Sequence, residues 1–177
     1  FKAGKNDVSH SHLDLGSFVV EASGIRWGID LGKDSYDLPG YFGHLRFTYY
    51  RLRNQGHNTL TIDGENQNFW ADAPIRAYGE RAGFTFAITD LTSAYPNKVR
   101  RWERGIAIVD GSSILIQDEV ECETAHDFIW SMHTRAEVHL DGEGATLTQG
   151  RRTATLRILA PPNARFELGS AKTPPPE

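Results

Sequence analysis

The sequence contains one cysteine, one methionine and no long apolar run. A lone Cys122 cannot form a disulfide within the chain, so the cysteine content does not decide the compartment. A membrane-spanning helix needs about 18 consecutive apolar residues, which no stretch approaches, and no signal peptide is recognisable. The formal net charge of −4 over 177 residues excludes a general polycation for nucleic acid or an anionic membrane.

Apolar and polar residues alternate along most of the chain, which is the pattern of β-strands. Short clusters of glycine, proline, asparagine and aspartate separate the alternating segments. We expect strands at 17–22, 25–31, 57–62, 84–91, 102–120, 127–134, 136–140, 145–149 and 153–159, with a hairpin around Asp110 and Gly111. The pattern predicts an all-β fold, an antiparallel β-sandwich.

The sandwich is expected to occupy residues 1–170 as one domain, followed by a proline-rich tail at 171–177. Because the chain begins with Phe1 rather than methionine, we expect it to be a piece of a longer protein.

Two histidines and an aspartate stand together in the stretch KNDVSHSHLDLGSF, at His10, His12 and Asp14. On a strand, alternate side chains share a face, so His10 and His12 would point the same way. Imidazole and carboxylate groups suit either zinc binding or acid–base chemistry. A zinc site would need further ligands, for which Asp30 and His57 are the best candidates. The alternative is a set of hydrogen-bonded or solvated side chains.

The ordered series HSHLDLGSF, WGIDLG, LPGYF and GHNTL resembles the C-terminal sandwich segment of the heparinase II/III family of polysaccharide lyases, which is related to alginate and oligo-uronate lyases. The later stretches VRRWERGIAIVDGSSILIQDEV and FIWSMHT are also similar to strands of that family. The resemblance covers about the first 135 residues and is densest in 4–67. It implies a sandwich that follows an N-terminal α/α toroid in the full-length enzyme.

The resemblance also implies roles for individual residues. Zinc would be held by His12, Asp30 and His57, while His10 would lie in the catalytic cleft. A cleft tyrosine of the family corresponds to Tyr41, with Tyr49 and Tyr50 as alternatives. Asp14 is open between two interpretations, a support for a metal-bound imidazole and a hydrogen-bonding turn residue.

The resemblance implies β-elimination in an acidic, uronate-containing polysaccharide or oligosaccharide. The family's tyrosine base and its carboxylate-neutralising residue come from the toroid, so the chain alone should be inactive. Relatives of this kind are typically periplasmic or secreted. A different function class stays open, namely a non-catalytic sandwich that binds carbohydrate or packs as an interaction module, with a metal that only stabilises it.

Substrate contacts are expected from Arg51, Arg53 and Trp70. The two arginines precede the HNT motif and could form bidentate contacts with anionic groups. The alternative is that they belong to a solvated strand face. Trp70 follows a turn and is the tryptophan most expected to be exposed for stacking on a sugar, whereas the other three are expected in the core.

Overall fold

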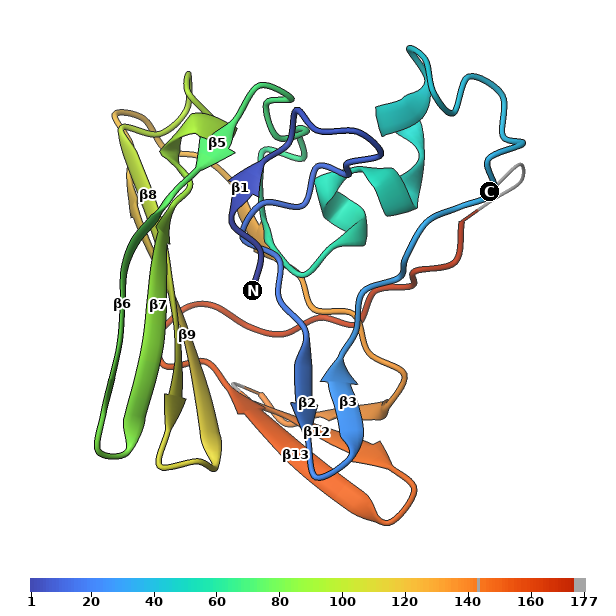
Figure 1. Cartoon of the computed structure of the whole chain (residues 1–177). Coiled ribbons are helices and arrows are strands. Elements are labelled where there is room, and N and C mark those ends of the chain that lie inside the picture. The colour runs from blue at the N-terminus through green and yellow to red at the C-terminus, as the bar shows by residue number, and fades with distance from the viewer. Residues whose placement is uncertain (143, 174–177) are drawn as a thin grey trace.

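The computed structural model describes residues 1–142 and 144–173, and within this part of the chain every strand pairing is antiparallel (Figure 1). The strands are β1 (Gly4–Lys5), β2 (Val20–Ala22), β3 (Ile25–Gly28), β4 (Leu60–Ile62), β5 (Asp72–Ala73), β6 (Ile75–Arg81), β7 (Phe84–Asp90), β8 (Arg101–Val109), β9 (Ser113–Glu121), β10 (Phe128–Trp130), β11 (Glu137–Leu140), β12 (Gly144–Gln149) and β13 (Arg152–Arg157). The described residues form no α-helix. The predicted all-β antiparallel sandwich is therefore confirmed.

The largest sheet has the order β6-β7-β8-β9 and forms the left side of Figure 1. A second sheet, β11-β12-β13, lies at the bottom of that view near the β2–β3 hairpin. Two short pairs, β1 with β5 and β4 with β10, complete the pairing. The β4–β10 pair joins segments that are distant in the sequence, with Ile62 opposite Phe128 and Leu60 opposite Trp130.

The predicted hairpin at 102–120 is present as β8 and β9, whose turn places Asp110 at φ 49° and Gly111 at φ 63°. Both values lie in the left-handed region that an Asp-Gly hairpin turn requires. The segment 127–134 is shorter than predicted, because only the three residues of β10 are in a strand. Strand β6 was not predicted, since its residues are mostly exposed and do not alternate between apolar and polar.

The main core forms between the β8 face of the large sheet and the β4 segment. Trp102 is fully buried there, and its indole Nε1 donates to Asp118 at 2.8 Å. The remaining buried members are Leu15, Leu60, Ile62, Ala71, Ala73, Leu91, Ala94, Tyr95 and Val99. Burying apolar area of this extent is the dominant stabilising contribution to such a fold.

Three consecutive 3-10 turns, η1 (Arg46–Thr48), η2 (Tyr50–Leu52) and η3 (Asn54–Gly56), lead directly into the HNT segment. They lie opposite the large sheet in Figure 1 and enclose a second small core of Tyr41, Tyr49 and Leu52. A fourth turn, η4 (Thr92–Ala94), precedes β8. These turns were not predicted, because they carry no repeating apolar pattern.

None of the helical segments among the described residues is long and apolar enough to cross a membrane. Of the predicted tail, residues 171–173 have no regular secondary structure, and 174–177 lie outside the described residues.

Candidate functional site

His10 and His12 lie in a loop and not on a strand, so the prediction that they share one strand face was wrong. His10 has φ 61°, in the left-handed region that non-glycine residues seldom adopt. The ring of His10 contacts Tyr36 and Phe42, whereas that of His12 faces His57. A residue held in such a conformation is a reason to look for a function at that position.

Contacts from distant segments fix this loop. The guanidinium of Arg46 donates to the carbonyl oxygen of Ser11 from Nη2 at 2.7 Å and from Nε at 3.2 Å. The backbone N–H of Leu13 donates to the carbonyl of Leu52 at 2.9 Å. The η1 and η2 turns therefore hold the loop on both sides of His12.

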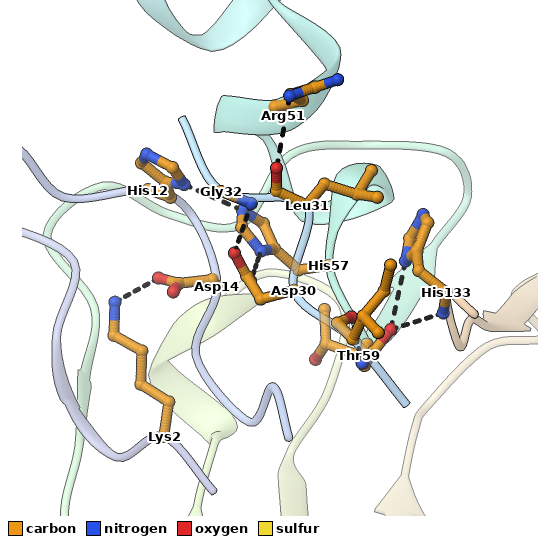
Figure 2. Close-up of polar contacts among 12 residues, drawn as sticks. Lys2, His12, Asp14, Asp30, Leu31, Gly32, Arg51, His57, Thr59 and His133 are labelled. Atoms are coloured by element: carbon orange, nitrogen blue, oxygen red, sulfur yellow. Dashed lines mark hydrogen bonds and ion pairs between the residues drawn. The ribbon is translucent and has the colours of Figure 1, made fainter. Parts of the chain in front are cut away.

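The three residues predicted as metal ligands come together at the end of this loop. Nδ1 of His57 lies 2.8 Å from the Asp30 carboxylate, and Nε2 of the same ring lies 3.2 Å from Nδ1 of His12 (Figure 2). His57 is fully buried, whereas the Asp30 side chain is 38% exposed. Asp30 also accepts the backbone N–H of Gly32 at 2.7 Å, so its carboxylate is held in place from two sides.

The charges of this group follow from its hydrogen bonds. The bond from His57 holds the pKa of Asp30 down to about 2, so the carboxylate is ionised at neutral pH. Burial and the nearby His57 lower the pKa of His12 to about 4, so its imidazole is neutral. Because Asp30 can only accept, Nδ1 of His57 carries a proton in this contact, while Nε2 of the same ring faces Nδ1 of His12.

This arrangement fits two nitrogen ligands of one metal ion. Two nitrogens at about 2.0–2.1 Å from a tetrahedral zinc would lie about 3.3 Å apart, close to the 3.2 Å between His12 and His57. Asp30 contacts the far nitrogen of His57, which is the position of a carboxylate that orients a ligating imidazole. Among residues 1–142 and 144–173, no three His, Cys, Asp or Glu side chains converge as a metal cluster. The predicted zinc and its three-ligand set thus stay predictions.

Asn58 joins the segments around the site. Its buried amide donates to the carbonyls of Phe18 at 2.7 Å and Ile29 at 2.9 Å. Its side-chain oxygen accepts the backbone N–H of His133 at 2.6 Å and faces Nδ1 of that ring at 3.1 Å. Nε2 of His133 then accepts from the hydroxyl of Tyr50 at 2.9 Å. The residue after His57 is therefore the point at which three separate segments are joined.

A buried ion pair connects the large sheet to the same loops. Arg104 on β8 is fully buried and makes a two-pronged contact with Asp118, with both distances at 2.7 Å. Its Nη1 donates to the carbonyls of Gly16 at 2.9 Å and Asn58 at 3.3 Å. The arginine thereby satisfies backbone groups on each side of the site.

Tyr41 is 2% exposed and packs below Tyr36 and Phe42, with ring centroids 5.1 and 4.9 Å away. Burial raises the pKa of its phenol, so the phenol keeps its proton at neutral pH. The alternative Tyr49 is also buried, and its hydroxyl donates to the carbonyl of Pro39. Tyr50 instead lies beside His133, and burial raises its pKa as well.

Within the part of the chain that the structure describes, no hydrogen bond or ring contact connects Trp70 with the predicted substrate-binding residues Arg51 and Arg53. Arg51 is held by the Asp34 carboxylate and the Leu31 carbonyl, both at 3.3 Å (Figure 2 shows the second contact). Arg53 is half-buried. Trp70 is 72% exposed, as expected of a stacking platform.

Asp14 forms an ion pair with Lys2 (Figure 2), and its backbone carbonyl accepts the N–H of Ser17 at 3.0 Å. These contacts agree with the turn-residue interpretation of Asp14.

The sequence assigned no role to several residues at the site. Arg46 and Arg104 look like ordinary surface arginines in a strand-rich sequence. Asn58 and Phe42 stand inside the GHNTL and LPGYF motifs, which were the available clue to both. Tyr36 lies in a segment where alternation gives no information about burial.

Comparisons with known proteins agree with this fold. The family model described as "Heparinase II/III-like, C-terminal" matches residues 1–171. The heparan sulfate lyase HepC from Pedobacter heparinus is similar, with a TM-score of 0.70 and 18% identity over 84% of this chain and 23% of that chain. A structure named Heparinase III has a TM-score of 0.64 and 22% identity, and the match covers 80% of this chain and 21% of that chain. The present chain therefore spans less than a quarter of either protein, and no curated protein sequence matches it.

Proposed function

Since the chain belongs to the heparinase II/III-like, C-terminal family, we propose that it is the β-sandwich part of a polysaccharide lyase that cleaves uronic-acid-containing glycans by β-elimination. The observation that carries this proposal is the meeting of His12, Asp30 and His57 next to the His10 loop, from three separate segments. The lyase names of the two similar structures support the same class. Together they favour it over a non-catalytic binding module.

The reaction needs one group to take the proton from C5 of the uronate and one to protonate the leaving oxygen at C4. The electrons of the C5–H bond form the C4–C5 double bond as the C4–O bond breaks. His10 is the exposed histidine of this site and is the group that we assign to proton transfer. Tyr41, the predicted cleft tyrosine, is 2% exposed beneath Tyr36 and Phe42. In this arrangement it supports the surface beside His10 and does not itself reach the leaving oxygen.

We assign zinc to the His12–His57 pair, with Asp30 either as the third ligand or as the group that orients His57. When bound, the ion would hold the two rings together and fix the loop that carries His12, which is a structural contribution. His10, two residues from His12, is then held in position relative to the substrate.

The remaining catalytic groups would come from an N-terminal toroid of the parent protein, so the 177-residue chain alone should show no lyase activity. The substrate partner is an acidic polysaccharide or oligosaccharide, and we place the parent in the periplasm or outside the cell. Arg51, Arg53 and Trp70 stay assigned to substrate contacts.

The test uses the full-length parent protein with heparan sulfate, alginate and a neutral polysaccharide as substrates. Ultraviolet absorbance of the unsaturated uronate reports elimination. We expect product from at least one uronate polymer and none from the neutral one. His10→Ala should lower kcat/KM by about 10²–10⁴-fold, the usual range for a lost acid–base group, while His139→Ala on the exposed face of β11 should not change it. No product from any uronate would refute the lyase assignment.

A further inference from the structure

Two large aromatic side chains are exposed beside His10. Tyr36 is 46% exposed and Phe42 is 61% exposed, and their ring centroids lie 5.1 Å apart. An exposed pair of apolar rings in contact is a typical mark of an interaction surface. We call Tyr36 and Phe42 the aromatic pair.

His10 lies against both rings of the aromatic pair. Its centroid is 5.5 Å from Phe42 in an edge-to-face arrangement and 6.0 Å from Tyr36. A ligand that covers the aromatic pair must therefore also contact the imidazole to which we assign proton transfer.

The surface beneath the pair is fixed. Tyr41 packs under both rings, and the Arg46 guanidinium lies 4.9 Å from the Tyr41 centroid and 5.7 Å from that of Phe42. Arg46 is itself anchored to the carbonyls of Ser11 and Tyr41. A platform that is ordered before binding loses little conformational entropy when a ligand arrives.

A cation stands at the edge of this platform. The Lys33 ammonium lies 3.9 Å from the centroid of Tyr36, and within the described part of the chain it forms no ion pair with a carboxylate. The nearby Asp34 is paired with Arg51 at 3.3 Å, and Asp37 contacts the hydroxyl of Ser35 at 3.3 Å. The positive charge is therefore available to an anionic ligand.

We propose that Tyr36, Phe42 and Lys33 form a saccharide subsite next to His10, which binds one acidic sugar ring of the substrate. The apolar C–H face of the pyranose stacks on the aromatic pair, and Lys33 meets a carboxylate or sulfate on the same ring or its neighbour. This inference rests on the proposed function and adds the residues that hold the sugar. Its occupant is an acidic oligosaccharide, because aromatic rings and a free ammonium together suit a ring that is apolar on one face and anionic at its edge.

The first experiment measures binding to the 177-residue chain by amide NMR, with a size-defined heparan sulfate oligosaccharide and an alginate oligosaccharide as probes. We expect the largest shifts at His10 and in 33–42. Phe42→Ala and Tyr36→Ala should each raise Kd by about tenfold, as for the loss of one stacking contact, and Lys33→Gln should reduce the salt dependence of Kd. The matched controls are Tyr78→Ala, which removes an 82% exposed ring on β6, and Lys5→Gln. Both should bind like the unaltered chain.

The subsite is refuted by any of three results. These are shifts confined to other surfaces, no saccharide binding at all, and Kd values for Phe42→Ala and Tyr36→Ala equal to those of the controls.

A second experiment, on the full-length parent protein, distinguishes failure of the subsite from failure of the proposed function. If the parent forms unsaturated product and Phe42→Ala raises KM with little change in kcat, the subsite stands. If the parent forms product but Phe42→Ala lowers only its melting temperature, the aromatic pair packs against another part of the parent, and the subsite is refuted while the lyase assignment survives. If the parent forms no product, both fail.

Discussion

Nδ1 of His57 donates to the carboxylate of Asp30 at 2.8 Å, while the opposite nitrogen of the same ring faces His12 at 3.2 Å. Asp30 precedes His57 by 27 residues and His12 precedes it by 45. One buried imidazole thus joins three segments, with a proton on the Asp30 side. The opposite nitrogen, which faces His12, is the one that a metal ion would take.

The metal-free protein should lose stability as the pH falls from about 6.5 to about 4. The folded state holds the pKa of His12 at about 4, below its ordinary value of 6.5, so in this window the unfolded chain binds a proton that the folded chain does not. A second loss of stability follows between pH 3.8 and about 2. Folding lowers the pKa of Asp30 from 3.8 to about 2, so the unfolded chain again binds a proton that the folded chain does not. Urea unfolding with a chelator present, across this pH range, measures both.

His12→Gln should flatten the pH dependence between 6.5 and 4, whereas His44→Gln, at an exposed position, should leave it unchanged. A profile that keeps its full slope in His12→Gln would show that His12 is not held neutral by its surroundings.

Loss of the buried Arg104–Asp118 ion pair should lower the free energy of unfolding by more than loss of a surface ion pair does. Arg104 is fully buried and also satisfies the carbonyls of Gly16 and Asn58. Arg104→Met removes the cation from the Asp118 carboxylate, which still accepts from the Trp102 indole, and takes a donor from two backbone carbonyls. The expected cost is about 3–5 kcal/mol. The free energy of unfolding in urea gives this value directly.

Arg101→Met is the matched control, because Arg101 neighbours Arg104 on β8 but contacts Glu103, Glu119 and Glu121 at the surface. Its unfolding midpoint should stay close to that of the unaltered protein. Equal losses for the two arginines would contradict the role given to burial.

Gly56→Ala should distort the approach to His57. A Cβ at position 56 would lie 2.2 Å from the carbonyl oxygen of Tyr50 and 3.0 Å from Cα of Arg51, so the backbone must shift. We expect a loss of about 1–3 kcal/mol from overpacking, together with a change in the ring resonances of His57. In Gly43→Ala the nearest atom is 3.6 Å away, so thermal unfolding of that control should stay unchanged. A normal melting temperature for Gly56→Ala would refute the close packing of η2 against η3.

The parts of this molecule that follow from local sequence were predictable. The β8–β9 hairpin follows from alternation and an Asp-Gly turn, and both signals lie within 19 residues. The meeting of His12, Asp30 and His57 was predictable only from the resemblance of ordered motifs, because no periodicity reports contacts across 45 positions. The left-handed turn at His10 was not predictable, since tertiary contacts such as the Arg46 bonds to Ser11 hold it.

The measurement that tests the central claim most directly is the zinc content of the purified chain after exposure to zinc and removal of the excess, read with its melting temperature. We predict about one zinc per chain and a melting temperature that falls when the metal is removed. His12→Ala should abolish both the bound zinc and the metal-dependent part of the stability, while His44→Ala should retain both. A chain that holds no zinc, or a His12→Ala variant that binds zinc as the unaltered chain does, would contradict the assignment of this site.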